Sequence, residues 1–524
     1  MLLLKLDGGN VGNLEGEHCA QPQGSHAPLE IPSLRDSVVS GGLWSLAQVV
    51  VNKALALVST FALMYLLAPM DYAVAGLALS IQSFVILLPA FTLGDALIAR
   101  GEDIHRLLGT ALRLCAAVSV VTACLLLLIG PFAAATFEQP SLVAACACIA
   151  IRPLLELALL GPHTRLRIRL AFRELSVIDG TCQGGATLAG ITMAALNCGW
   201  ASLILPQIVF TGVRAWMYSA KLGRPTGGPR WLPLEAPALF AAYSASGLGQ
   251  YLHGGLLMLP PLLIGWFAST EQVGLFSMAF TLSASINVVV AVSIGLVLQP
   301  VFARMADDPN RQASAFLRSC GIIAAVSMPL CLCQAAVVGP LFRLLLPARW
   351  EHAESMAALL SIGQAFYFAV NPAMSLLKSQ GRFKAFFLWQ GIQLAVVGGA
   401  MAAAGALLSD TPAMAITAIA SLYTLIWSPI GVWLCIRNQP KAVRRSLLLF
   451  WLPATAAALA VAPVWVGFVY LGGQGWWWDI ARTTVIPTTT ILLFPLLLKK
   501  LDLVTFNELR HVLSALRAQM RARR

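Results

Sequence analysis

Long apolar runs dominate this chain and restrict its fold more than any other feature. Runs of about 20 apolar residues recur along its 524 residues, and charges or Gly/Pro breaks separate them. Hydrocarbon offers the backbone no hydrogen-bond partner, so only helices and closed barrels span a bilayer, and runs of this length suit helices. We therefore expect an all-α polytopic membrane protein.

The composition agrees with this expectation and excludes two other classes of protein. Hydrophobic residues make up 58% of the chain and charged residues 11%, and the mean hydropathy is +0.78. Soluble domains carry about 25% charged residues, and disordered chains lack this many apolar ones. An ordinary soluble protein and a disordered chain are both excluded.

The apolar runs predict about fourteen transmembrane helices. Their expected ranges are 38–67, 72–98, 107–132, 141–162, 176–197, 201–220, 237–268, 274–302, 317–342, 353–377, 385–408, 412–436, 446–470 and 482–498.

Basic residues accumulate in alternate loops between these helices. One side, together with both tails, holds 28 of the 35 Lys and Arg residues, and the other side holds only Arg343, Arg349 and Arg482. Because basic loops stay in the cytosol, both termini are predicted to be cytosolic. The net charge of +12 then serves orientation and contact with anionic membrane lipids, and it does not indicate a nucleic-acid partner.

The predicted helices divide the chain into five segments. We expect a disordered cytosolic tail over 1–37, an N-lobe of helices 1 to 6 over 38–220, a C-lobe of helices 7 to 12 over 237–436, helices 13 and 14 over 446–498, and a basic cytosolic tail over 499–524.

The two lobes repeat one another at an offset near 210 residues, where Gly130-Pro131 matches Gly339-Pro340 and Phe172-Arg173 matches Phe383-Lys384. Six helices per lobe is an even number, so both lobes have the same orientation. Parallel repeats of this kind enclose a central cavity around an axis along the membrane normal.

Seven charged residues fall inside the predicted helices more than two residues from either end, where an unpaired charge is expensive. They are Lys53, Arg113, Arg152 and Arg214, and the acidic Asp95, Glu156 and Asp179. Arg113 and Arg214 lie near cytosolic helix ends and can extend their side chains to the interface. Lys53 and Arg152 lie near mid-membrane. Arg152 has Glu156 at i, i+4, which leaves two interpretations open, a structural ion pair or a substrate-binding charge.

Uncharged polar residues form stripes at helical spacing on three helices, of which helices 1 and 7 are the corresponding first helices of the two lobes. The stripes are Ser45, Gln48 and Asn52 in helix 1, Tyr243, Ser246, Gln250 and His253 in helix 7, and Gln390 with Gln393 in helix 11. Such a stripe either binds helices together or lines a wet cavity, and its presence in both lobes favours the cavity. His253 by itself is more typical of a satisfied core histidine than of a proton switch.

No enzyme motif is present in the sequence. It contains neither a phosphate-binding GxxxxGK[ST] loop nor an HExxH zinc motif, and the predicted outer loops are too short for a catalytic domain. The 11 Cys residues form no CxxC pair, so we interpret them as small packing residues. We therefore predict no catalytic residues, no bound metal and no cofactor.

Several segments are similar to one transporter family. The opening "GGLWSLAQVVVNKALALVSTFALMYLLAPMDYAVAGLALSIQSFVILLPAFTLGDALIARGE" resembles the first two helices of Wzx-type polysaccharide flippases of the MOP exporter superfamily. "RLAFRELSVIDG" resembles their basic-aromatic cytosolic loop, and "LPARWEHAESMAALLSI" the outer loop after helix 9. The likeness covers roughly 40–440 and lacks an invariant signature. The tail 1–37 departs from it.

The resemblance implies two pseudo-symmetric six-helix lobes in a bacterial plasma (inner) membrane. It also implies movement of undecaprenyl-diphosphate-linked oligosaccharide to the outer leaflet, for lipopolysaccharide or exopolysaccharide biosynthesis. It implies that Lys53, Arg113, Arg152 and Arg214 meet the diphosphate. Polysaccharide polymerase and export proteins are further candidate partners. A glycan also needs amide and aromatic groups, which Gln48, Asn52, Gln250 and His253 and their neighbours in the stripes supply.

Three alternatives remain at this stage. A multidrug cation antiporter of the same superfamily should carry mid-membrane carboxylates, and the second lobe has none. A lipid II flippase is a closer alternative that the sequence leaves open. A scaffold without transport activity is the third.

Overall fold

The computed structural model describes most of the chain between Val58 and Asp502. The described residues are 55, 58–86, 93, 104–168, 172–222, 232–233, 235–303, 305, 308–438, 440–473, 475–502, 505–507, 509–510 and 514. Within them the chain forms helices and turns only, so the predicted all-α class is confirmed. The predicted tail 1–37, most of the first predicted helix and much of the tail 499–524 lie outside the described residues.

The described helices follow one another along the chain in a simple order. After the helical segment Val58–Leu66 come α2 (Pro69–Val85), α4 (Ile104–Thr136), α5 (Ser141–Ala150), α6 (Arg152–Ile168), α7 (Phe172–Ala195), α8 (Ala201–Leu222), α9 (Ala236–Phe267), α10 (Thr270–Ala303), α11 (Pro309–Leu345), η3 (Ala348–Trp350), α12 (Ala353–Phe366), η4 (Tyr367–Ala369), α13 (Val370–Ser379), α14 (Phe383–Leu407), α15 (Pro412–Ile436), α16 (Pro440–Leu471) and α17 (Trp476–Leu501).

Eight helical spans in the described part are long and apolar enough to cross a membrane. A ninth is added if Val58–Leu66 and α2 are counted as one bent span. Helices α7 to α10 also begin and end within four residues of predicted ranges. The chain is therefore a multi-pass helical membrane protein, and the total of fourteen helices stays a prediction.

The fourth predicted helix of each lobe is interrupted shortly before a proline. The predicted helix 141–162 consists of α5 and α6, which meet at Ile151, just before Pro153. The predicted helix 353–377 consists of α12 and α13, joined by the 3-10 turn η4 before Pro372. Proline has no backbone N–H and crowds the carbonyl four residues earlier, so the regular helix breaks at that point.

The chain turns by 119° between Val58–Leu66 and α2. Pro69 is the first residue of α2, and the Asp71 carboxylate accepts a hydrogen bond from the Ala68 N–H at 3.0 Å. A proline and an acceptor at these positions are typical of a helix start. The turn coincides with the predicted boundary between the first two helices.

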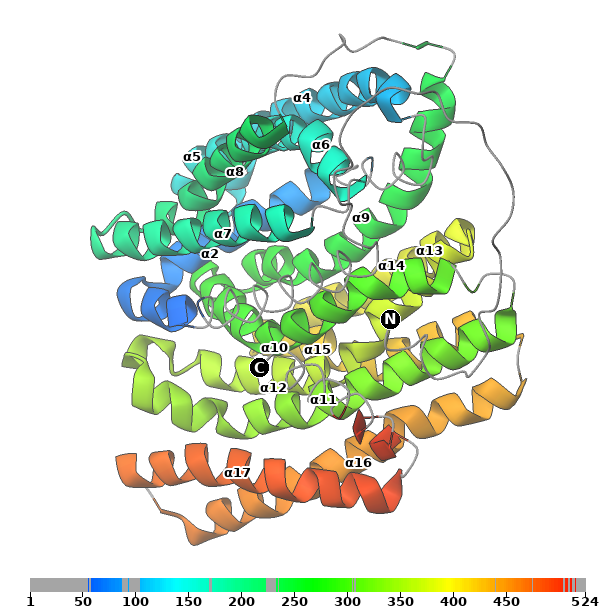
Figure 1. The fold of residues 1–524 in the computed structure, drawn as a ribbon. Helices are drawn as coiled ribbons and strands as arrows, with labels where there is room; N and C mark the ends of the chain where they lie inside the picture. The colour runs from blue at the N-terminus through cyan, green and yellow to red at the C-terminus, as the bar shows by residue number, and fades with distance from the viewer. Residues whose placement is uncertain are drawn as a thin grey trace, which may run out of the picture.

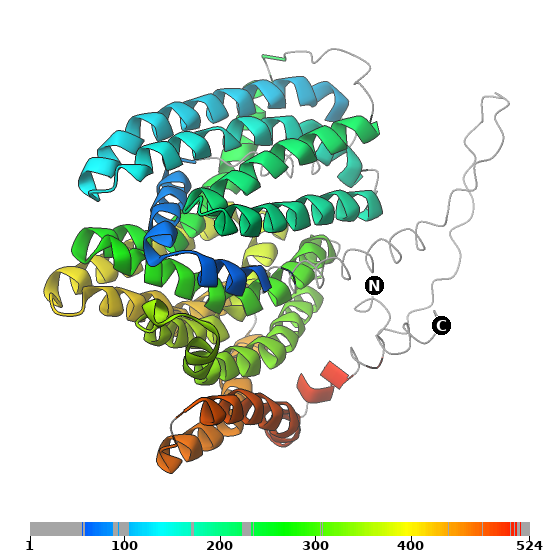
Figure 2. The same cartoon turned by 90° about the vertical axis from the view of Figure 1, so that its left-hand side faces the viewer.

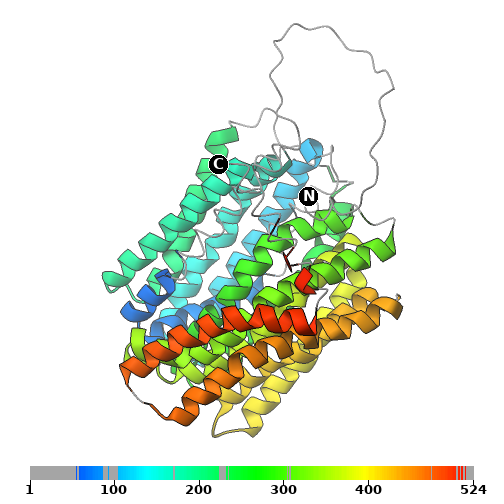
Figure 3. The same ribbon diagram turned by 60° about the horizontal axis from the view of Figure 1, so that its bottom comes forward.

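Figures 1 and 2 show how the helices are arranged. Helices α4 to α8 lie together, and we call them, with Val58–Leu66 and α2, the first half. Helices α9 to α15 lie beside them and form the second half. The pair α16 and α17 lies at the edge, packed together and against α11, and Figure 3 brings this edge forward.

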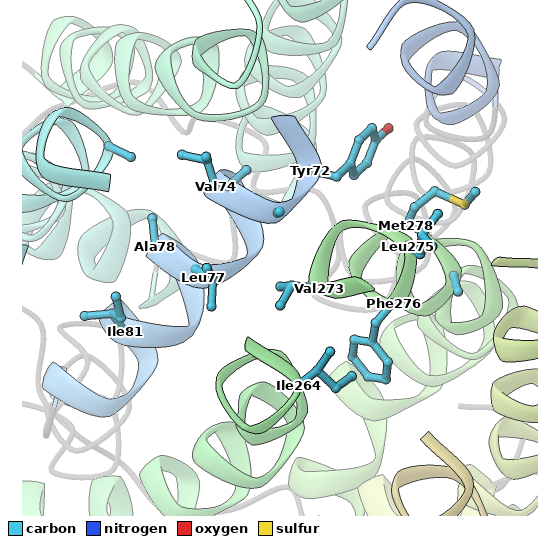
Figure 4. Packing of buried hydrophobic residues seen from close by; sticks show 14 of the residues in the cluster. Tyr72, Val74, Leu77, Ala78, Ile81, Ile264, Val273, Leu275, Phe276 and Met278 are labelled. Carbon is cyan, nitrogen blue, oxygen red and sulfur yellow. The ribbon is translucent and has the colours of Figure 1, made fainter. Parts of the chain in front are cut away.

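Helix α2 packs against the second half as well as its own. Its contacts include α5 on one side and α9 and α10 on the other. The largest buried cluster follows this contact and joins both halves, as Figure 4 shows for α2 and the residues Ile264, Val273, Leu275, Phe276 and Met278. This apolar contact is therefore the main face between the halves.

The turns predicted to lie outside are close to one another. The Trp350 indole donates to the Met64 carbonyl at 2.7 Å, and the Thr270 hydroxyl donates to the Phe137 carbonyl at 3.2 Å. We call this end of the bundle the outer end, following the charge-based prediction.

The turns predicted to be cytosolic meet at the opposite end. The Gln380 amide donates to Gln312 at 2.8 Å, and Arg382 donates to the Leu434 carbonyl at 3.2 Å. Each loop in these contacts thus lies beside loops that are predicted to be on the same side of the membrane.

Candidate functional site

The predicted site residues of the first predicted helix lie outside the described residues. These are Gln48, Asn52 and Lys53. Asp95, at the end of the second predicted helix, is also outside them. The described part of the site therefore begins with α4.

Arg152 is the first residue of α6, directly after the interruption at Ile151. Its Nε donates to the Glu156 carboxylate at 3.0 Å, one helical turn along. The Arg152 side chain is 40% exposed and that of Glu156 24% exposed. A guanidinium has five N–H donors, and this pair uses one of them. Arg152 can therefore stay paired and still present donors to an anionic ligand.

Arg214 is held inside the first half by an acceptor on the neighbouring helix. The carboxylate of Asp179, on α7, lies 3.6 Å from an Arg214 Nη and accepts a hydrogen bond from the Tyr218 hydroxyl at 2.7 Å. Tyr218 is fully buried, and its ring packs edge-on against His163 of α6. Arg214 therefore pairs α8 with α7, and Tyr218 extends the contact to α6. Arg113 is exposed on α4.

Gln250 and His253 of α9 contact residues of their own half. Gln250 accepts a hydrogen bond from the Lys378 ammonium of α13, and the ring of His253 stacks on Tyr367, with Nε2 2.7 Å from its hydroxyl. His253 is buried. In this conformation the two residues thus belong to a polar cluster inside the second half.

Sequence reasoning did not single out Lys378. It was counted with the cytosolic loop residues, because it follows the predicted helix 353–377 by one position. In the structure it occupies the last turn of α13, where its ammonium also lies 5.5 Å from the centre of the Phe386 ring. Nothing in the sequence pattern distinguishes it from its neighbours Arg382 and Lys384.

Several buried polar atoms of this cluster have no hydrogen-bond partner within the described part. They are His253 Nδ1, both amide atoms of Gln390 and the Gln393 carbonyl oxygen. Buried groups of this kind are normally paired with protein or with ordered water. The cluster is therefore suited to hold water inside the second half.

The two halves meet through helix ends as well as through the apolar face. Tyr251 of α9 donates to the Phe84 carbonyl at 2.9 Å, near the end of α2. At the outer end, a Cβ on Gly274 would lie 1.9 Å from the Pro69 carbonyl oxygen. Only glycine permits this approach, so the first turns of α2 and α10 touch through their backbones.

The sequence matches the family described as "Polysaccharide biosynthesis protein" over residues 62–355. It is 24% identical to the lipopolysaccharide biosynthesis protein WzxC of Escherichia coli (strain K12) over 442 residues, which cover 80% of this chain and 85% of that protein. It is 24% identical to the teichuronic acid biosynthesis protein TuaB of Bacillus subtilis (strain 168) over 356 residues, 65% of this chain and 70% of that protein.

Among solved structures, the fold is similar to the lipid II flippase MurJ in an inward closed conformation. The TM-score is 0.65 at 10% sequence identity, and the match covers 87% of this chain and 98% of MurJ. At this identity the likeness concerns the fold alone.

Proposed function

Because the chain belongs to the polysaccharide biosynthesis protein family, we propose that it moves an undecaprenyl-diphosphate-linked oligosaccharide across a bacterial plasma membrane. The direction is from the cytosolic to the outer leaflet, and the mechanism is alternating access. The protein acts as a transporter without catalysis, and its termini are cytosolic. Polysaccharide polymerase and export proteins then receive its product.

The contact between the two halves is the observation that supports alternating access. Helix α2 packs on α9 and α10 along an apolar face. The hydrogen bonds described between the helices of the two halves run from second-half side chains to carbonyls near helix ends of the first half. Such a face can separate without breaking any helix, so two rigid halves can rock about it.

The position and exposure of Arg152 support the proposal that the substrate is anionic. A diphosphate loses hydration on entering the membrane, and a guanidinium can replace that hydration with charge-assisted hydrogen bonds. Arg152 keeps 40% of its side chain exposed while it is paired with Glu156. We assign the diphosphate to Arg152 together with Lys53, and a packing role to Arg214.

The distribution of carboxylates argues against a multidrug cation antiporter. Glu156 and Asp179 each lie beside an arginine. The described carboxylates of the second half lie at helix starts or in turns, and they are Glu271, Asp308, Glu351, Glu354 and Asp410. A cationic drug would therefore meet no unpaired mid-membrane carboxylate among the described residues of these helices.

Deletion of the gene tests the function. We expect lipid-linked oligosaccharide to accumulate on the cytosolic leaflet and surface polysaccharide to be lost, with both restored by the wild-type chain. Normal surface polysaccharide in the deletion strain would overturn the proposal. Altered dye resistance with intact polysaccharide would support the antiporter, and arrested peptidoglycan synthesis would support the lipid II flippase.

A further inference from the structure

The first described helix ends with backbone carbonyls that its own turns do not satisfy. The last four carbonyls of any helix lack an intrahelical partner. In Val58–Leu66, the Leu63 carbonyl accepts from the Leu67 N–H at 2.8 Å. The next two carbonyls, of Met64 and Tyr65, face the outer turn of the second half.

Two consecutive residues of that turn donate to these carbonyls. The Trp350 indole N–H donates to the Met64 oxygen at 2.7 Å, and the Arg349 guanidinium donates to the Tyr65 oxygen. Both donors belong to the 3-10 turn η3 between α11 and α12. The second half therefore caps the end of a first-half helix, across 286 positions in the sequence for Trp350 and Met64.

The Trp350 side chain also closes the space beneath the cap. It is fully buried, as is Met64, and its ring packs edge-on against Tyr72 of α2 at 5.4 Å between centroids. Trp350, Met64 and Tyr72 all belong to the buried cluster that joins the halves. Separation of the halves at this end must withdraw the indole from both contacts and expose them to water.

We propose that Arg349 and Trp350 form an outer latch, which holds the halves together at the outer end and must release the Met64 and Tyr65 carbonyls before the transporter opens there. This inference rests on the proposed function, because a latch has a role only if the halves move apart. Release is feasible because water can then satisfy the carbonyls and both donors.

The latch differs from the other contacts between the halves in its burial. Thr270 donates a single hydrogen bond to the Phe137 carbonyl at 3.2 Å, and neither side chain is buried. Tyr251 reaches the Phe84 carbonyl about 18 Å beyond Tyr72 along α2, at 1.5 Å per residue. Among these contacts, Trp350 alone combines a short hydrogen bond, complete burial and a ring contact to the other half.

Trp350→Phe tests the latch, because phenylalanine keeps a ring against Tyr72 and lacks the N–H donor. The measurement is amide hydrogen exchange of the full-length protein in nanodiscs. We expect peptides covering 62–72 and 345–353 to exchange roughly tenfold faster than in the wild type, while peptides of α16 and α17 stay unchanged. Trp476→Phe is the matched control, since Trp476 is an exposed tryptophan at the start of α17.

Unchanged exchange in Trp350→Phe would overturn the latch. If that variant does not fold, Arg349→Met removes the second donor from an exposed side chain, and equal exchange in this variant and the wild type is then the overturning result. The exchange experiment needs no transport. If hydrogen exchange is unchanged but the deletion strain loses its surface polysaccharide, only the latch is refuted. If the deletion strain keeps normal polysaccharide, the proposed function is refuted.

Discussion

Asp479, in the first turn of α17, accepts two hydrogen bonds from the guanidinium of Arg343 near the end of α11. The distances are 2.8 Å to Nη2 and 3.2 Å to Nε, so the pair is bidentate. Glu354 of α12 lies 3.3 Å from the Nη1 of the same arginine. Asp479 is buried, with 10% of its side chain exposed. This contact fixes α17 to the second half at the outer end.

Asp479→Asn should loosen α17. The amide cannot accept the bidentate charge-assisted pair, and we expect a loss of about 1–2 kcal/mol of stability, moderated by the exposure of Arg343. Thermal unfolding of the detergent-solubilised full chain measures it. Asp410→Asn, in an exposed turn at the same end, is the control. Equal unfolding temperatures for Asp479→Asn and the wild type would contradict the structural role of the pair.

Arg152→Ala should abolish most polysaccharide export at normal protein levels. The diphosphate then loses a cation in the membrane interior, and we expect export to fall roughly tenfold or more. Surface polysaccharide normalised to membrane-inserted protein is the measurement, and Arg437→Ala, exposed at the end of α15, is the control. Unchanged surface polysaccharide would remove Arg152 from the site.

Glu156→Gln separates the two roles of Arg152. If Arg152 only forms an ion pair with Glu156, removal of either partner should reduce export to the same degree. If Arg152 binds the diphosphate, we expect Glu156→Gln to retain most of the export that Arg152→Ala loses. The same polysaccharide assay compares the two variants side by side, and equal losses would favour the ion pair.

Lys53→Arg should be tolerated better than Lys53→Ala. Lys53 lies outside the described residues, so this prediction rests on its mid-membrane position in the sequence. Charge is what a diphosphate requires, and arginine retains it. The measurement is polysaccharide export by the two variants at matched expression. An equal loss in both would indicate a packing role for Lys53.

A disulfide between positions 76 and 277 should stop export. A Cβ on Gly76 would lie 2.2 Å from the Oγ and 3.1 Å from the Cβ of Ser277. The usual Cβ separation in a disulfide is about 3.5–4.5 Å, so α2 and α10 must shift slightly apart to accept the bond. We expect the double variant Gly76→Cys with Ser277→Cys to be inactive when oxidised and active after reduction, since the bond joins α2 to α10. Ser277→Cys alone is the control. Full export by the oxidised, cross-linked protein would exclude separation of the halves at this face.

The sequence alone accounts for the elements of the fold. The apolar runs predict many of the described helices closely, for example α14 and α15, whereas α11 begins eight residues and α17 six residues before the predicted start. The spacing of Arg152 and Glu156 likewise places both on one face of a helix. Each of these predictions depends on neighbouring residues only, because membrane insertion and helix breaking are local properties.

Contacts between helices that are distant in the sequence could not be predicted from local patterns. No pattern in the sequence connects Arg343 with Asp479 or Trp350 with Met64, which lie 136 and 286 positions apart. The sequence also did not predict which neighbouring helix the Gln250 and His253 stripe faces. A stripe is visible in the sequence, but the neighbour it faces depends on how α9 is rotated against α13 and α14.

The sequence by itself thus determined the class of protein, the order of its helices and a predicted orientation, all of which follow from hydropathy and loop charge. Only the tertiary structure decided which polar groups meet. The halves join at α2, Trp350 caps Met64, and Lys378 reaches Gln250. These pairings depend on helix rotation and packing, which the whole chain sets together, because side-chain contacts between helices arise only once every helix has its neighbours.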